Sequence, residues 1–497
     1  MSTSTTPPDS RRWQALILLS VAQFMVILDV SIVTVALPAM ARSLGFSEQS
    51  LQWVLNAYLL VFGSVLLLGG RAADLFGRRR MFSVGLAIFG LASLVGGFAP
   101  SAGVLIAARA VQGLGAAIIA PVALSIIQTL FAHDPKEYTK AMGIWGSSAP
   151  VGGAAGVLLG GVLTQTLGWG WVLFVNVPVA ALALALTPLL LHHGRPAGAR
   201  PHLDLAGALS VTGALVLLVD AIVEANGAGW TAPRTLGLVA AAVVLLVAFI
   251  AIETRVSQPL VPLGVFRAPN FAGGALLTAL LGAAWIPTWY VISLYAQQVL
   301  GFSALQAGLA YLPMTLLLIV IMLGAISTLI GRVGIKPLAL GGLALLALGA
   351  LLFARAPVGG TYAADILPAS LVAALGMALA FVPITIAGLS GVGSAQAGLA
   401  SGVLNTAYQI GSALGLAIAV AVATARTTGL RAGGTGHLAA LTGGFAGAFV
   451  VAAALAALGV AFGLVAIRTP RAATTTPETA GAAGAAGERR PVGRAAS

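Results

Sequence analysis

Fourteen long apolar segments constrain this chain more than any other feature of its sequence. A helix needs about 20 mostly apolar residues to cross a bilayer. The segments lie at residues 15–40, 51–70, 81–99, 104–130, 141–165, 171–191, 205–224, 236–253, 271–299, 305–330, 337–355, 365–388, 402–424 and 444–467. They show no period-two alternation and are too long for barrel strands. The sequence therefore predicts an all-α integral membrane protein with 14 transmembrane helices.

The composition supports this class. The chain is 59% hydrophobic and 8% charged, whereas soluble domains carry about 25% charged residues. Its lack of cysteine excludes disulfides and thiolate metal sites, and we expect no metal or other cofactor. Among the basic residues Arg far outnumbers Lys, which indicates a GC-rich bacterial genome. The predicted location is the bacterial cell (plasma) membrane, with the first segment too long to be a cleaved signal peptide.

The basic residues are distributed unevenly along the chain. If the N-terminus lies in the cytoplasm, 19 of the 25 Lys and Arg fall in cytoplasmic segments, five fall outside, and Arg109 lies within a helix. An excess of Lys and Arg in cytoplasmic loops sets the orientation of membrane proteins. The pattern predicts that both termini are cytoplasmic. It also explains the net charge of +12 without a nucleic-acid partner.

The sequence contains an internal repeat at an offset of 254 residues. Two glycines and an arginine recur at the same spacing in residues 70–78, after the second segment, and in residues 324–332, at the end of the tenth. This match is informative because it combines turn-forming residues with a charge. Parallel six-helix repeats are a standard architecture of secondary transporters. The predicted organisation is a cytoplasmic tail at 1–14, a six-helix bundle at 15–191, two inserted helices at 205–253, a second six-helix bundle at 271–470 and a disordered cytoplasmic tail at 471–497, which is rich in Ala, Gly, Thr and Pro.

Asp29 places a carboxylic acid near the middle of the first apolar segment. Its neighbours three and four residues away are all apolar. A charge at a helix centre costs about 2.5–3.5 kcal/mol on insertion scales, and removal from water favours the neutral acid. A carboxyl group that gains and loses a proton is what a proton-coupled carrier requires. The alternatives are an Asp29 kept ionised by a buried partner and a direct contact with a cationic substrate.

Five segments together resemble the motifs of the fourteen-helix drug:proton antiporters of the major facilitator superfamily. They are residues 28–38, 70–80, 105–117, 290–313 and 397–415. Each segment is a modest match alone, but their order and spacing are specific, and the resemblance extends to about Arg471. It implies an efflux transporter that exports small amphipathic drugs or secondary metabolites in exchange for protons. Its partners would be the substrate, protons and the lipid bilayer, and it would act as a monomer.

The resemblance also implies roles for two groups of residues. The cytoplasmic loop motif, implied to be a conformational latch, consists of Gly70, Asp74, Gly77, Arg78 and Arg79; a plain topology signal is the alternative. The fifth-segment motif, implied to pack helices closely, consists of Gly152, Gly156, Gly160 and Gly161. The proline that the family motif carries is replaced here by Val157.

Arg109 in the fourth segment is the candidate partner of Asp29 in proton coupling. Gln112 and Gly113 share its helix face. At 1.5 Å per residue, Asp29 lies about 16 Å from the outer end of its segment and Arg109 about 8–13 Å from the outer end of its own. Two interpretations remain open: a direct contact between the two side chains, and an Arg109 that is purely structural and points outward.

Aromatic and amide side chains predict a substrate cavity between the two bundles. Trp285 and Trp289 share one helix face, and Asn405, Tyr408 and Gln409 lie close together in the thirteenth segment. A mostly apolar pocket with few polar anchors suits amphipathic organic molecules. Ordinary packing is the alternative for each of these residues.

Three other functions are compatible with parts of the sequence. A proton-coupled importer or a facilitator would use the same fold. A polytopic membrane enzyme would need a cluster of catalytic residues. The one polar cluster to consider is residues 133–137 (HDPKE), and these fit better as the loop between the fourth and fifth segments. A channel is disfavoured, because the sequence has no filter-like loop. Asp220 and Glu224, in the inserted segments, are the alternative acids for proton coupling.

Overall fold

The computed structural model describes residues 9–131, 134–191, 204–256, 259–261, 263–392 and 396–467. The side chains of a few residues inside these ranges, Asp74 among them, lie outside the description. The predicted C-terminal tail at 471–497 also lies outside these ranges, as do residues 1–8 of the predicted N-terminal tail. The first helix begins at Asp9, six residues before the apolar segment.

In the described part, 14 helices are long and apolar enough to cross a membrane and no strand occurs, which confirms the predicted fold class. The first six are α1 (Asp9–Leu44), α3 (Trp53–Phe76), α4 (Arg78–Gly97), α5 (Ala102–Phe131), α6 (Pro135–Thr166) and α8 (Asn176–Leu190), with two short helices, α2 (Glu48–Leu51) and α7 (Trp171–Phe174). The next two are α9 (Leu205–Ala228) and α10 (Pro233–Arg255), followed by the short η1 (Leu263–Arg267).

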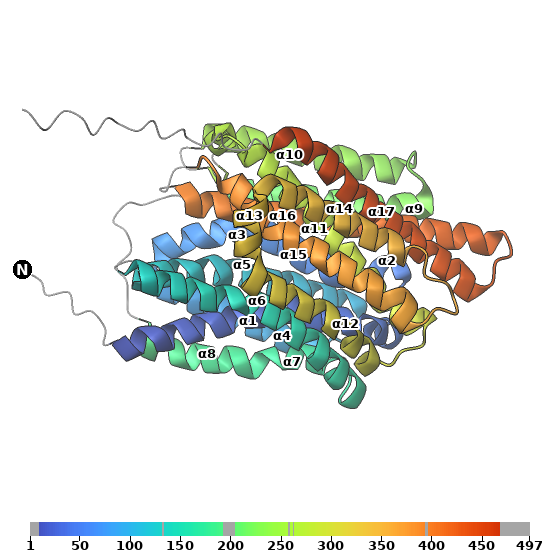
Figure 1. Ribbon diagram of the computed structural model, residues 1–497, viewed down its shortest axis with the longest axis horizontal. Coiled ribbons are helices and arrows are strands. Elements are labelled where there is room, and N and C mark those ends of the chain that lie inside the picture. The colour runs from blue at the N-terminus through green and yellow to red at the C-terminus, as the bar shows by residue number, and fades with distance from the viewer. Residues whose placement is uncertain are drawn as a thin grey trace, which may run out of the picture.

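The last six spans contain three stretches of π-helix. The spans are α11 (Phe271–Leu294) with η2 (Tyr295–Val299), α12 (Ala304–Val320) with η3 (Ile321–Ala325) and α13 (Ile326–Val333), α14 (Ile335–Phe353), η4 (Tyr362–Ile366) with α15 (Leu367–Leu389), α16 (Ala397–Ala432), and α17 (His437–Ala466). Most of these helices run side by side along the long axis of the molecule (Figure 1). We call the end where α1 begins and α17 ends the basal end, and the end where α1 ends and α17 begins the distal end.

Glycines with positive φ mark the turns between consecutive spans. Gly77 has φ +90° and separates α3 from α4, and Gly334, also at φ +90°, separates α13 from α14. Only glycine adopts this backbone conformation without strain. Gly331, which corresponds to Gly77 in the repeat, lies inside α13, and the chain turns three residues later at Gly334.

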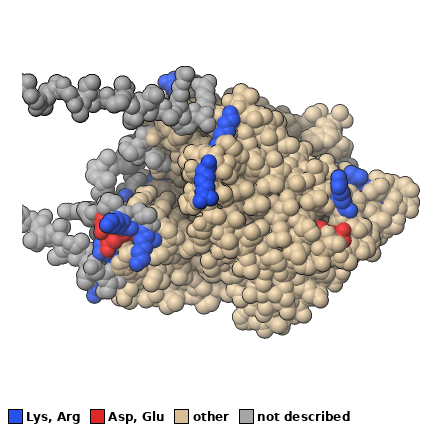
Figure 2. All heavy atoms as spheres, viewed as in Figure 1, with Lys and Arg blue, Asp and Glu red and all other residues tan. Residues whose placement is uncertain are grey.

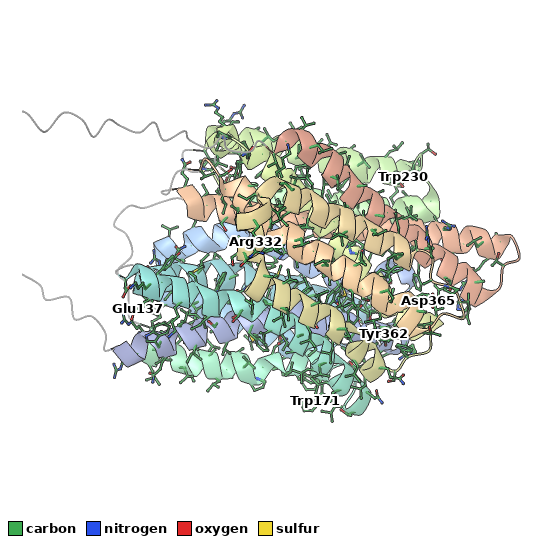
Figure 3. The ribbon with its side chains drawn as sticks, in the orientation of Figure 1. Glu137, Trp171, Trp230, Arg332, Tyr362 and Asp365 are labelled. Atoms are coloured by element: carbon green, nitrogen blue, oxygen red, sulfur yellow. The ribbon has the colours of Figure 1, made fainter. Side chains whose placement is uncertain are left out.

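The polar residues near the start of α6 have a structural role at the basal end. Asp134 caps the helix, and its Oδ1 accepts a hydrogen bond from the backbone N–H of Lys136 at 2.8 Å. Glu137 forms an ion pair with Arg12 at 2.8 Å, joining α6 to α1. Figures 2 and 3 show acidic and basic side chains gathered near Glu137, whereas most of the face in view is uncharged. His133 lies outside the described residues.

The helices pack as two groups with an inserted pair beside them. In the first group α1 packs on α6 and α5 packs on both α3 and α4; in the second, α11 packs on α16 and α14 packs on α15. The inserted helix α9 contacts both groups, through α3 and α16, and α10 packs on α9. Val243, Val244 and Val247 on α10 are more than half exposed. In a multi-pass membrane protein, lipid covers such surfaces.

Candidate functional site

Asp29 is buried among polar side chains from two other helices. It is 0% exposed. Its Oδ1 accepts hydrogen bonds from Asn176 Nδ2 at 2.8 Å and from Gln112 Nε2 at 3.1 Å, and its Oδ2 forms an ion pair with Arg109 Nη1. The contact between Asp29 and Arg109 that the sequence left open is therefore present.

Arg109 is held from several sides. It is also 0% exposed, and its Nε donates to the carbonyl oxygen of Val54 at 3.0 Å, while its Nη1 donates to Gln112 Oε1 at 2.8 Å. Its guanidinium carbon lies 4.5 Å from the ring centre of Tyr58. A buried charge is tolerated when it is paired and hydrogen-bonded. The Arg109 guanidinium therefore links α1, α3 and α5 around one buried ion pair.

Two members of this polar network were not singled out from the sequence as functional residues. Asn176 begins α8 and lies 147 positions from Asp29, and Ser93 of α4 accepts a hydrogen bond from Gln112 Nε2 at 2.7 Å. Both are single polar residues among apolar neighbours, which is the one sequence signal that they carry. A lone Asn or Ser of this kind occurs throughout membrane helices, so no pattern in the sequence connects these two residues with Asp29.

The glycines of the fifth-segment motif lie where α6 approaches other helices. A Cβ atom added at Gly152, Gly156 or Gly160 would meet α1 backbone atoms at 3.0 Å or less. Gly161 lies instead against α12, where an added Cβ would meet the carbonyl oxygen of Ala304 at 2.7 Å. Val157, which replaces the family's proline, is fully buried, and its carbonyl oxygen faces Gly308 of α12. One helix therefore packs tightly within its own group and across to the second.

The residues of the loop motif lie at the basal end of α3 and α4. Gly70 has room for a methyl group, and Gly77 is the positive-φ turn. The Arg78 guanidinium donates to Thr129 Oγ1 and to the carbonyl oxygen of Ser125, both in the last turns of α5. Arg79 is half-buried beside it. The side chain of Asp74 lies outside the described part, so the structure does not report the contact expected for it.

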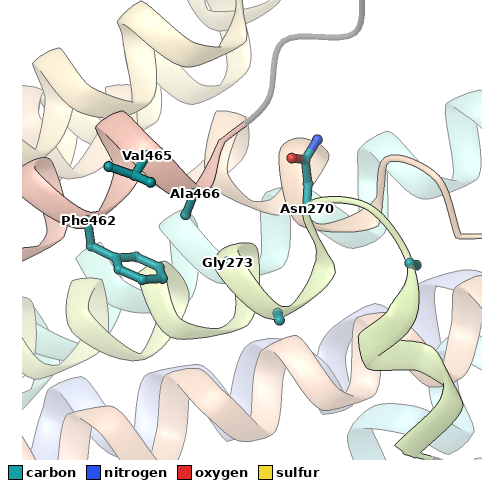
Figure 4. A pocket seen from close by; sticks show the side chains of 7 residues that line it. Asn270, Gly273, Phe462, Val465 and Ala466 are labelled. Atoms are coloured by element: carbon teal, nitrogen blue, oxygen red, sulfur yellow. The ribbon is translucent and has the colours of Figure 1, made fainter.

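The candidate cavity residues form two groups. On α11 the ring centres of Trp285 and Trp289 lie 5.6 Å apart, and Trp289 stacks on Tyr311 of α12 at 4.7 Å. On α16 the ring of Tyr408 packs edge-on against Phe381. The two other α16 residues differ in environment: Asn405 is exposed, whereas Gln409 is buried with its Cβ against Gly63 of α3. The pocket in Figure 4 is separate from both groups and lies at the basal end, between the start of α11 and the end of α17.

The two groups of helices are joined by hydrogen bonds in their distal halves. Ser293 Oγ donates to the Thr34 carbonyl oxygen at 2.9 Å, and Gln297 Nε2 donates to the Val35 carbonyl oxygen at 3.0 Å, joining the α11–η2 span to α1. Gln165 Oε1 accepts from the backbone N–H of Leu305 at 3.2 Å, joining α6 to α12. These bonds close the distal side between the groups.

The basal halves of α6 and of the α12–α13 span differ from their distal halves. At Gly143 and Gly146, in the basal half of α6, and at Gly153, just past its midpoint, an added Cβ would meet nothing within 4 Å. The same holds at Gly324 and Gly331 on the α12–α13 span. The space beside these glycines is open, which contrasts with the tight contacts between α6 and α12 at Gly161 and Gly308.

Comparisons with known proteins agree with this architecture. Residues 19–416 match the family model described as Major Facilitator Superfamily. The chain is 42% identical to the puromycin resistance protein pur8 of Streptomyces alboniger, over 82% of this chain and 81% of that protein. It is 41% identical to the cephamycin export protein CmcT of Amycolatopsis lactamdurans, over 83% and 85% of the two chains. A solved bacterial homolog of the human lysosomal transporter Spinster shares the fold, with a TM-score of 0.66 at 18% identity over 93% of this chain and 98% of that one.

Proposed function

The chain belongs to the major facilitator superfamily, and on this premise we propose that it exports small amphipathic organic compounds in exchange for protons. Its similarity to antibiotic export and resistance proteins supports efflux. The observation that carries the proton coupling is the acid itself, Asp29, fully buried in a membrane helix and paired with Arg109. The same pair fits the alternative of an Asp29 kept ionised by a buried partner, and proton flux in Asp29→Asn distinguishes the two. An ionisable residue inside a membrane helix is a functional site by default, because its burial is costly.

Proton exchange at Asp29 requires the site to open. With both charged residues 0% exposed, a proton in bulk water has no route to the carboxylate in this state. When a second state admits water, a proton binds to Asp29, the carboxyl group becomes neutral, and its attraction to Arg109 is lost. The two protonation states thereby favour different arrangements of α1 and α5, which is the requirement for coupling.

The driving force is sufficient for uphill export. A proton that moves down 100 mV gains about 2.3 kcal/mol, and one pH unit adds about 1.4 kcal/mol. One proton per cycle would therefore support a roughly 500-fold gradient of a neutral substrate, since each 1.4 kcal/mol is a factor of ten.

Substrate binding is assigned to the space between the two helix groups. The aromatic faces of Trp285, Trp289 and Tyr408 suit flat apolar groups, and the amides of Asn405 and Gln409 suit polar substituents. The closed distal side and the open basal positions of α6 support a state that receives substrate from the basal side. We assign the basal end to the cytoplasm, with both termini there and with the protein acting as a monomer in a bacterial plasma membrane.

Flux measurements in proteoliposomes test this function. The protein is reconstituted and supplied with puromycin or a cephamycin, with and without an imposed pH gradient. We expect uphill movement of at least one compound toward the side of the distal end only when the gradient is present. Movement in the opposite direction would support an importer instead, and gradient-independent flux would support a facilitator. Reporter fusions at both termini test the orientation, and a terminus outside the cell would contradict it.

A further inference from the structure

Two buried polar atoms beside Asp29 have no hydrogen-bond partner: Arg109 Nη2, which is a donor, and Asn176 Oδ1, which is the one acceptor of the two. The amide of Asn176 is 1% exposed, and while its Nδ2 donates to Asp29 Oδ1, its own Oδ1 has no hydrogen-bond partner. A buried polar atom without a partner is destabilising, so this arrangement calls for a reason. We propose that Asn176 is a positioning residue that satisfies Asp29 in both of its protonation states. The inference rests on the proposed role of Asp29 as the proton-coupling acid.

The other partners of Asp29 serve the ionised form alone. An ionised carboxylate only accepts hydrogen bonds, and Arg109 and Gln112 both donate to it. A guanidinium has no acceptor atom. The acceptor atom of Gln112, Oε1, already receives a hydrogen bond from Arg109 Nη1. In this arrangement Gln112 presents its Nε2 to Asp29 and its Oε1 to Arg109, and turning its amide would put an N–H group against the guanidinium. Neither residue therefore presents an acceptor to the O–H of a neutral Asp29.

Asn176 is the partner that can reverse its role. A protonated carboxyl group carries an O–H that needs an acceptor. Rotation of the Asn176 amide about its Cβ–Cγ bond exchanges the positions of Nδ2 and Oδ1, so that Oδ1 faces Asp29 and accepts this O–H. The proton stays on Asp29 throughout, and Arg109 keeps its charge. The amide therefore donates a hydrogen bond to the carboxylate before protonation and accepts one from the acid after it.

Asn176 lies at the junction between two helices. It is the first residue of α8, directly after the short helix α7 and Val175, and α8 packs against α1 and α4. The hydrogen bond therefore ties the middle of α1 to the start of α8.

Infrared difference spectroscopy of the purified protein in lipid nanodiscs, between high and low pH, tests the proposal without a transported substrate. The C=O stretch of a protonated carboxyl group falls in frequency with each hydrogen bond that the group makes. Asp29→Asn assigns the band by removing it. We expect Asn176→Leu, which is close in volume but has no polar atoms, to move the Asp29 band to higher frequency. We expect Asn176→Ser, whose hydroxyl both donates and accepts, to move it back toward the original frequency.

A matched control separates this role from general packing. Asn56 is also fully buried with an unpartnered Oδ1, but it bonds to Gln52 and not to Asp29, so Asn56→Leu should leave the band unchanged. An unmoved band in Asn176→Leu would overturn the proposal for Asn176 alone. A titrating band that persists in Asp29→Asn would overturn the proposed coupling itself. If Asn176→Leu does not fold, Asn176→Ala removes the same two polar atoms and is read in the same way.

Discussion

The first helix of each six-helix group is packed in the same way, but only one of the two carries a charge. Gly152 and Gly156 bring α6 onto α1, and Gly411 and Gly415 bring α16 onto α11, where added Cβ atoms would overlap the backbone around Ala279 and Ala283. Since Gly156 faces Leu28 and Gly415 faces Ala283, the position of Asp29 in the second group is taken by Ala284, which is 0% exposed. The close helix contact therefore needs no acid.

The surroundings of Asp29 on α1 and of Ala284 on α11 also differ in polarity. Asp29 lies among Arg109, Gln112 and Asn176. On α11, the hydroxyls of Thr278 and Thr288 instead bond to carbonyl oxygens of their own helix. In the described part of the second group no buried ion pair is found. The packing of the first helix is therefore shared by both groups, whereas the charged site belongs to the first group alone. The following experiments test these two statements.

The largest expected effect comes from removing one partner of the ion pair. Arg109→Leu leaves Asp29 as an uncompensated buried carboxylate, which typically costs about 3–5 kcal/mol. Thermal unfolding in detergent should show a large loss of stability, and the double variant Asp29→Asn with Arg109→Leu should recover most of it. Arg332→Leu, at an exposed arginine of α13, is the control and should change little. An Arg109→Leu protein as stable as the original would mean that the pair is not buried as described.

The next effect concerns the shared packing. Gly156→Ala and Gly415→Ala each place a methyl group against backbone, and overpacking of this kind costs about 1–3 kcal/mol. Gly153→Ala, one turn from Gly156 on the open side of α6, should be neutral or stabilising, because Ala favours a helix by up to about 1 kcal/mol over Gly. Unfolding temperatures of the three variants provide the measurement. Equal effects at Gly153 and Gly156 would contradict the packing scheme.

A smaller effect is expected in the aromatic group of the second half. Trp289→Ala removes the aromatic face that is proposed to contact the substrate, and an aromatic contact is worth about 0.5–1.5 kcal/mol, so binding of an exported compound should weaken by up to roughly tenfold. Trp289→Phe should preserve most of the affinity. Trp230→Ala, at an exposed residue near the distal end, should leave it unchanged. Calorimetric titration gives the three dissociation constants, and an unaltered affinity in Trp289→Ala would remove this residue from the cavity.

The smallest expected effect on binding belongs to the loop motif. Asp74→Asn should lower the transport rate while substrate affinity stays within a few-fold, because the residue lies near the basal end of α3, far from the midplane. Rates and affinities measured on the same preparation provide the test. A large loss of binding with a normal rate would contradict a latch.

The sequence was a good guide where the property is local. Apolar runs of about 20 residues predict membrane helices because lipid can satisfy no backbone group, and the 14 spans follow from this. Asp29 was visible for the same reason, as one charge in an apolar run. The depth estimate left its contact with Arg109 open because it measured depth from the helix ends. α1 continues to Leu44, which places Asp29 still farther from its helix end, and yet the two side chains pair. The distance from a helix end therefore did not measure depth.

Properties that depend on distant segments were harder to predict. Asn176 and Ser93 join the site only through the packing of α8 and α4 against α1 and α5, which no local pattern specifies. The repeat aligns Gly331 with Gly77, but the chain turns at Gly334, and the spacing of the glycines alone does not specify which of the two ends the helix.

The most direct test of the central claim is made at Asp29. The Asn variant is close in size and polarity to the protonated acid, and its side-chain oxygen can still accept a hydrogen bond from Arg109. Because Arg109 then keeps a buried charge without a counter-ion, substrate exchange without a gradient, measured on the same preparation, serves as the check that the variant is folded. In proteoliposomes with an imposed pH gradient, flux of a compound that the unmodified protein exports is recorded together with a pH-sensitive dye. We expect Asp29→Asn to show no uphill export and no substrate-dependent proton movement. Uphill export with substrate-dependent proton flux in this variant would contradict the claim and direct attention to Asp220 or Glu224 of α9.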